Sequence, residues 1–93
     1  MKLEFLKNIY KIVKLHVDDK MPDNIIGDEF YSITKTNEEI SIVINENIDI
    51  DSKNIECGWK TIKIVGNLDF ALVGILAKIS KALVDNNISI FVI

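Results

Sequence analysis

Alternating apolar and polar positions characterise the first half of the chain. Residues 9–17 place Val13 and Leu15 on one face of an extended segment, with a mixture of residue types on the other face. This period of two is typical of a β-strand. The same pattern predicts strands from Phe30 to Thr34 and from Ile40 to Ile44, the last with three isoleucines on one face.

Polar segments flank the third of these strands. Thr36 and Glu39 before it have the spacing of a capping box, in which a threonine hydroxyl and a glutamate side chain each satisfy a free backbone N–H group. The spacing predicts a single helical turn at this point. Residues 45–56 after the strand are largely polar, and we expect them to form a loop between two halves of the chain.

The period changes in the second half. A strand is expected from Trp59 to Val65, followed by a helix from about Phe70 to Val84. The apolar stripe of that helix recurs at helical spacing and consists of Leu72, Ile75, Leu76, Ile79 and Leu83. Asn86 and Asn87 are expected to end the helix. Residues 88–93 are almost all apolar, which predicts a strand buried on both faces and reached by a right-handed parallel crossover.

The predicted order is therefore three strands followed by strand, helix and strand. This order indicates an α+β fold in which a helix covers one face of a sheet. A chain of 93 residues is the size of one small domain.

Charge and composition exclude several classes of function. The net charge is −3 and the chain contains no arginine, so a nucleic-acid partner is not expected. One cysteine excludes an internal disulfide and a cysteine-based metal site. No apolar run reaches the ~18 residues of a membrane span, and no signal peptide is recognised at the N-terminus. We therefore expect a cytoplasmic protein with no membrane partner and no cofactor.

The turn before the predicted helix is the best candidate for a binding site. Its residues are Gly66, Asn67, Leu68, Asp69 and Phe70, with Gly74 and Ile75 one helical turn further on. Backbone N–H groups at a helix N-terminus carry a partial positive charge. Gly74 removes a side chain, which allows a ligand or another chain to approach closely. The alternative, given equal weight, is that Gly74 serves helix–sheet packing and that Asp69 only caps the helix.

Other chemically active residue types form no catalytic set. His16 stands alone, without the further ligands that a metal site requires. Cys57 has no histidine near it in the sequence and is expected to be buried and unreactive. Trp59 is expected in the core or at its rim. The carboxylate pairs of residues 38–39 and of Asp49 with Asp51 are expected on a solvated surface. The sequence therefore predicts no enzyme.

Several segments taken together resemble a known family. The chain resembles small bacterial ACT-domain proteins with aspartate-kinase-like ACT units, a type of unit that also occurs in cytosolic arginine sensors. The resemblance covers roughly residues 10–93 and is specific as an ordered combination. The matching segments are Phe30–Thr36, Glu38–Val43, Gly58–Lys60, Gly66–Phe70 and Gly74–Ala77.

The resemblance implies a ferredoxin-like sheet and a non-catalytic regulatory module. It implies that an amino acid or similar small metabolite binds at an interface between ACT units. The ligand residues implied are Gly66, Asn67, Leu68, Asp69 and Phe70, with Gly74 and Ile75. Residues 9–56 correspond to a degenerate first unit and residues 57–93 to the start of a second. The alternative function is a ligand-free module for protein interaction or oligomerisation.

The sequence departs from the family pattern at its end. Family members continue past the strand of residues 88–91 into a further strand, helix and strand, which this chain lacks. The predicted fold is therefore incomplete at the C-terminus. Exposed apolar strand edges promote pairing with another chain, so we expect a homo-oligomer.

Overall fold

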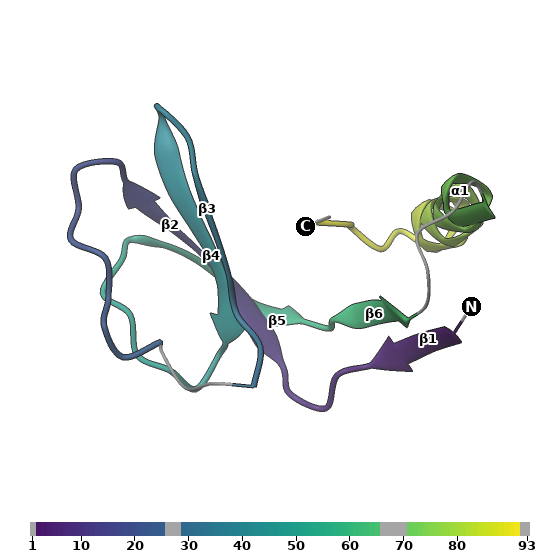
Figure 1. Cartoon of the computed structure of the whole chain (residues 1–93), viewed down its shortest axis with the longest axis horizontal. Coiled ribbons are helices and arrows are strands. Elements are labelled where there is room, and N and C mark those ends of the chain that lie inside the picture. Colours follow the sequence, from purple (N-terminus) through teal and green to yellow (C-terminus); the bar gives the residue numbers. More distant parts are fainter. Residues whose placement is uncertain (1, 26–28, 66–70, 92–93) are drawn as a thin grey trace. The chain divides into compact units, whose positions relative to one another are not determined.

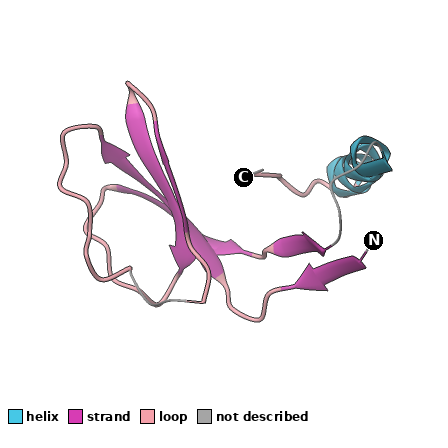
Figure 2. Ribbon diagram, viewed as in Figure 1, coloured by secondary structure: helices cyan, strands magenta, loops and turns pink. Residues whose placement is uncertain are grey.

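The computed structural model describes residues 2–25, 29–65 and 71–91 of the chain (Figure 1). The chain divides into two compact units. One unit is Leu3–Lys63, and the other is Ile64–Ile93 together with the first two residues. The larger unit carries a four-stranded sheet and the smaller one carries the helix, so the chain is α+β (Figure 2).

The four-stranded sheet is built from β2 (Tyr10–His16), β3 (Ser32–Lys35), β4 (Glu39–Asn45) and β5 (Asn54–Trp59). Its spatial order is β3-β4-β2-β5, and all neighbouring strands are antiparallel. The strands β2, β3 and β4 confirm the three strands predicted for the first half, with their ends shifted by one or two residues.

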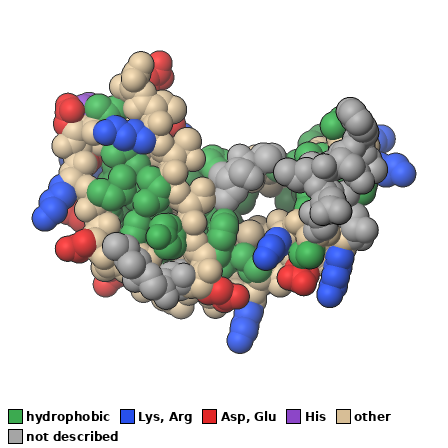
Figure 3. All heavy atoms as spheres, in the orientation of Figure 1, with side chains coloured by type: hydrophobic (Ala, Val, Ile, Leu, Met, Phe, Trp, Pro, Cys, Tyr) green, Lys and Arg blue, Asp and Glu red, His purple; other side chains and the backbone are tan. Residues whose placement is uncertain are grey.

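The larger hydrophobic cluster covers one face of this sheet. Its strand residues are those that the alternation assigned to a single face: Val13, Leu15, Ile40, Ile42 and Ile44. Ile25 and Ile50 from the connecting segments complete the buried cluster, and Met21 and Ile48 pack against it. Figure 3 shows hydrophobic side chains gathered over the sheet, with charged side chains around them.

A smaller cluster occupies the opposite face. Tyr10, Ile12 and Val43 are buried there. The rings of Tyr10 and Phe30 meet edge to face, with centroids 5.7 Å apart and planes at 77°, a favoured arrangement for aromatic pairs. Trp59 is half-buried and packs against this cluster, so the tryptophan lies at the rim of the core, one of the two positions expected for it.

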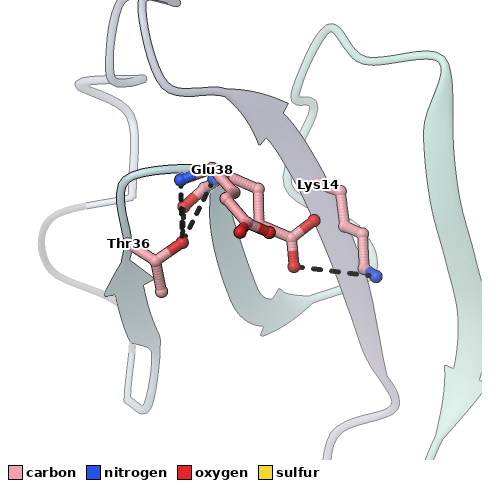
Figure 4. Close-up of polar contacts among 4 residues, drawn as sticks. Lys14, Thr36 and Glu38 are labelled. Carbon is pink, nitrogen blue, oxygen red and sulfur yellow. Dashed lines mark hydrogen bonds and ion pairs between the residues drawn. The ribbon is translucent and has the colours of Figure 1, made fainter.

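The predicted helical turn at residues 36–39 is wrong. These residues connect β3 to β4 in a tight antiparallel hairpin, in which the Thr36 N–H donates to the Glu39 carbonyl at 3.0 Å. The Thr36 hydroxyl does accept the Glu38 and Glu39 N–H groups, at 3.1 and 3.2 Å. The threonine half of the capping box is therefore present, but it closes a strand turn. The Glu39 carboxylate instead lies 3.8 Å from the Lys14 ammonium on β2 (Figure 4).

Removing the Thr36 hydroxyl should weaken this hairpin. We expect Thr36→Ala to lower the free energy of unfolding by about 1 kcal/mol, because two backbone N–H groups lose their acceptor. Urea denaturation followed by Trp59 fluorescence measures the change. Thr34→Ala in β3, two residues before the turn, is the control, since its hydroxyl makes no hydrogen bond within the described residues. Equal losses in both variants would show that the hydroxyl does not hold the turn.

The region expected as a loop and one strand contains two strands. β5 pairs with β2 on the side away from β4, and β6 (Ile62–Val65) follows after two residues. A register shift between β2 and β5 lies at Tyr10 and Ile12, and Gly58 there has φ of +84°. Glycine adopts this conformation without the steric cost of a side chain. Its N–H donates to a carboxylate oxygen of Glu46 at 3.2 Å.

A strand that the sequence analysis did not predict begins the chain. β1 (Lys2–Phe5) pairs with β6 in a separate two-stranded sheet. The Leu6 N–H donates to the Thr61 carbonyl at 2.9 Å and extends the same pairing by one hydrogen bond.

The helix is confirmed as α1 (Ala71–Asp85). Asn87 has φ of 59°, as expected for the residue that ends it. The Asn87 N–H donates to the Val84 carbonyl and the Ile88 N–H to the Leu83 carbonyl, at 3.0 and 2.8 Å. The predicted buried strand after the helix is wrong for residues 88–91, which form no strand and are exposed. The predicted parallel crossover is therefore not formed within the described residues.

Candidate functional site

The predicted ligand turn lies largely outside the described residues. This holds for Gly66, Asn67, Leu68, Asp69 and Phe70 and for the proposed cap made by Asp69. The described flanks have the predicted character, since β6 ends at Val65 and α1 begins at Ala71. The two remaining predicted site residues, Gly74 and Ile75, lie in the second turn of α1.

Gly74 lies on an open surface of the helix. A Cβ atom built at Gly74 meets no heavy atom within 4 Å among the described residues. No described residue therefore accounts for the missing side chain at position 74. A glycine inside a helix costs about 1 kcal/mol relative to alanine, and nothing in the described packing offsets that cost.

Ile75 is half-buried, and the stripe to which it belongs is only partly covered. Ile79 and Leu83 are also half-buried, whereas Leu76 is exposed. Val73 and Val84, on other faces of the helix, are 72% and 64% exposed. The surface of α1 therefore presents apolar side chains beside the open backbone of Gly74.

The polar side chains at the end of α1 stabilise the helix itself. The Lys81 ammonium lies 2.8 Å from the Asp85 carboxylate, one turn apart on the exposed surface. The Asn86 side-chain amide donates to the Ala82 carbonyl at 2.7 Å. Both contacts are local, and an exposed pair of this kind contributes only about 0.3 to 0.5 kcal/mol.

A second concave site lies in the unit of residues 3–63, where the sequence analysis expected only solvated surface. It is an open hollow at one end of the sheet, with a volume of about 860 Å³. Leu15 and Ile50, both largely buried, contribute to its apolar lining together with Met21 and Pro22. Its charged side chains are Asp19, Asp23, Glu38, Glu39, Asp49, Asp51, Lys14, Lys20 and Lys53.

The charges of this hollow are mixed but mainly negative, since six carboxylates outnumber three lysines. An anionic ligand is therefore disfavoured there. Hydrogen bonds hold the loops around the hollow. The Asn24 side-chain amide donates to the Asp49 carbonyl at 2.7 Å, and the Ser52 hydroxyl donates to the Lys14 carbonyl at 2.6 Å. Sequence reasoning recognised the carboxylate pairs but not that the hairpin and the loop before β5 bring them to one end of the sheet.

The predicted exposure of His16 is confirmed, whereas the predicted burial of Cys57 is wrong. His16 is exposed on a strand, as predicted, and its Nδ1 accepts the Asp18 N–H at 3.2 Å. The Asp18 carboxylate lies 3.6 Å from the same nitrogen. Cys57 was expected to be buried and is exposed on β5.

Metal binding and membrane insertion also bear on the class of site. Within the described residues, no group of three or more histidine, cysteine, aspartate or glutamate side chains is arranged to hold a metal ion. In the same part of the chain, no helix is long and apolar enough to cross a membrane.

Comparisons with known proteins match both halves of the chain. A family model described as an ACT domain matches residues 54–93. A model described as an N-terminal domain matches residues 8–51. Among solved structures, the chain is similar to protein Atu0741 from Agrobacterium tumefaciens, with a TM-score of 0.83 and 34% sequence identity. That match covers 98% of this chain and 68% of the other. No curated protein matches the chain.

The chain therefore belongs to the same family as the Agrobacterium protein, and it is a small ACT-domain protein. The ACT match contains all of the predicted ligand residues, from Gly66 to Ile75. It also contains β5, β6 and α1, the elements on either side of the predicted turn.

Proposed function

We propose that this protein is a non-catalytic regulatory module that binds an amino acid or a similar small metabolite. The observation that carries the proposal is the ACT match over residues 54–93, because it includes the turn between β6 and α1. ACT domains are regulatory modules. The proposal includes a cytoplasmic location, aspartate-kinase-like ACT units and assembly into a homo-oligomer.

The proposed ligand site is the turn Gly66–Phe70 together with Gly74 and Ile75. A helix N-terminus offers N–H groups and a partial positive charge to a ligand carboxylate. The open surface at Gly74 supports a ligand position beside α1, since a side chain there has room in the fold but would occupy space that a ligand needs. We further propose that residues 9–56 are a degenerate first ACT unit and that residues 57–93 begin the second.

The exposed apolar surface of the helix unit favours a second candidate function. Val73 and Val84 on α1 and Ile88, Ile90 and Phe91 after it are all exposed. Scattered apolar residues are normal on a surface, but a group of them marks an interaction site. The second candidate is a ligand-free module that acts through protein interaction.

Thermal unfolding against each of the twenty amino acids separates the two candidates. A ligand present at a hundred times its dissociation constant adds about 2.7 kcal/mol to the stability of the folded state. A chain of this size would report that gain as a rise in melting temperature of about 10 °C or more. A rise for one amino acid supports the ligand-binding module. No rise for any of them, in a well-folded sample, supports the interaction module.

Substitution of Gly74 tests the proposed position of the ligand. We expect Gly74→Ala to raise the stability of the ligand-free protein by about 0.5 to 1 kcal/mol, because the added methyl group has room and alanine favours the helix. Gly74→Leu should also fold but should lose the thermal shift with ligand, because its side chain fills the space beside the turn. In Gly74→Leu the fold would then be kept while the thermal shift with ligand is lost.

Ala82→Leu is the matched control, since it enlarges an exposed position of the same helix far from the turn. It should keep the full ligand shift. A ligand shift that survives in Gly74→Leu would place the ligand elsewhere. Asp69→Ala gives an independent check, because loss of the shift in a folded protein indicates a ligand contact, whereas a change in stability alone indicates a cap.

A further inference from the structure

The edge strand β3 of the four-stranded sheet has the properties of a self-pairing surface. The order β3-β4-β2-β5 leaves one side of β3 without a neighbouring strand in that sheet. Ile33 on this edge is 38% exposed, Thr34 and Lys35 are exposed too, and Tyr31 just before the strand is 39% exposed. An exposed strand edge with unpaired backbone groups is a template for another strand.

Two hydrogen bonds fix which backbone groups of β3 point outward. The Thr36 N–H donates to the Glu39 carbonyl across the hairpin, and the Glu46 N–H donates to the Ile9 carbonyl on the β2 side. Backbone groups alternate in direction along an antiparallel strand. The odd-numbered residues of β4 therefore face β3, and the even-numbered residues face β2.

The register between β3 and β4 then shows which backbone groups of β3 face outward. Thr34 lies opposite Ser41 and Ser32 opposite Val43, so the N–H and C=O groups of Ser32 and Thr34 face β4. The same groups of Ile33 must then point to the open side, together with those of Lys35. Within the described residues, no side chain or backbone group hydrogen-bonds to them there.

We propose that β3 pairs antiparallel with β3 of a second copy of this chain, about a two-fold axis at Ile33. In that register Ile33 lies opposite the partner's Ile33, and the two exchange both of their outward hydrogen bonds. Ser32 lies opposite the partner's Thr34, a favourable hydroxyl pair. Tyr31 lies opposite the partner's Lys35, where the ammonium can meet the face of the ring.

Charge along the segment favours this antiparallel arrangement. Glu29 precedes the strand and Lys35 ends it, and both are exposed. Antiparallel pairing brings the negative end of each segment beside the positive end of the other, whereas parallel pairing would bring like charges together.

Burial favours it as well. Ile33 lies opposite Ile42, which has no exposed surface, so Ile33 extends the apolar face of the larger cluster to the sheet edge. A partner strand would continue that face. The contact is short, and a specific stable interface buries about 1,200 Å² or more. The dimer is therefore weak and forms in the micromolar to millimolar range of protein concentration.

This inference makes the proposed homo-oligomer specific, and it does not depend on ligand binding. Sedimentation equilibrium of the full chain over that concentration range tests it. We expect Ile33→Lys to weaken dimerisation at least about tenfold, because it sets two ammonium groups directly opposite each other at the axis. Ile55→Lys is the matched control, since Ile55 is 37% exposed on the other edge strand, β5.

A cross-linking experiment provides a positive test. In a hydrogen-bonded antiparallel pair the Cα atoms are about 5.5 Å apart, which is within the range of a disulfide. Ile33→Cys in a Cys57→Ser background should form a covalent dimer rapidly under mild oxidation. Ile55→Cys in the same background should do so much more slowly.

Weaker dimerisation in Ile33→Lys alone, together with selective cross-linking at position 33, supports the proposal. A protein that stays monomeric up to millimolar concentration overturns it. A dimer that persists unchanged in Ile33→Lys also overturns it and would place the oligomer contact on another surface, while the proposed ligand site would be unaffected.

Discussion

Replacing Ile42 by alanine is expected to lower the free energy of unfolding by about 3 to 4 kcal/mol. Ile42 lies in β4, has no exposed surface and belongs to the larger hydrophobic cluster. Strands pair with β4 on both sides, and Ile42 lies opposite Val13 of β2 and Ile33 of β3. Since these ladders hold the neighbouring side chains in place, the core cannot close over the space left by the lost atoms, and the cavity adds to the lost burial.

Urea denaturation followed by the fluorescence of Trp59 measures this loss, because the tryptophan packs against the same sheet. Ile55→Ala is the matched control. Ile55 lies on the same face, opposite Val13, but is 37% exposed, so its truncation should cost less than about 1.5 kcal/mol. Similar losses in the two variants would mean that the cluster around Ile42 is not the stabilising core.

Replacing Tyr10 by alanine is expected to cost about 3 to 5 kcal/mol, the range for a buried aromatic residue. Tyr10 has no exposed surface, and its cross-strand neighbours are Asn45 on one side and Trp59 on the other. Its ring also meets the edge of Phe30. One substitution therefore removes the centre of the smaller cluster, and the loss is a large share of the stability of a small domain.

Tyr31→Ala is the control for this variant, because Tyr31 is the only other tyrosine of the chain and is 39% exposed. Both are measured at low protein concentration, so that self-association does not contribute. A clear fall in stability for Tyr10→Ala with little change for Tyr31→Ala is the expected result. A small effect at Tyr10 would contradict the assignment of a second buried cluster.

The strands β2 and β4 could be predicted from the sequence because their alternation is strong. The isoleucines of β4 repeat with period two, and burial of one face leaves no other register for them. The residues that cause β2 and β4 to form therefore lie within the strands themselves. The burial of Lys11 was not predictable in the same way, because a lysine in a strand is usually exposed and only the packing of the folded sheet covers it.

The split between β5 and β6 could not be predicted, because the strand β5 reads as polar. All of its residues before Trp59 are exposed, so no apolar face marks it. β5 exists because the backbone of β2 has a free side to pair with, and this is a tertiary cause. Gly58 was the available signal, since glycine inside a strand often marks a bulge.

The strand predicted after the helix does not form among the described residues, because an apolar composition alone is not sufficient for a strand. An apolar run such as Ile88–Phe91 has the composition of a buried strand, yet a strand also needs a neighbour, and the described residues supply none. For the candidate site, the sequence predicted the elements on both sides of the turn and the unusual glycine at position 74. It did not predict that Gly74 faces open space, because that depends on packing.

The pairing of β5 with β2 means that the segments matched by the family models and the compact units of the structure have different borders in this protein. The N-terminal match ends at residue 51 and the ACT match begins at residue 54, yet the first strand of the ACT segment completes the sheet of the other segment. A division of the chain between the two matches would leave β2, the strand with the longest run of buried residues, as an unprotected edge. The unit that holds its sheet complete extends to Lys63. An ACT segment exchanged between relatives would therefore also need a first strand that can pair with β2.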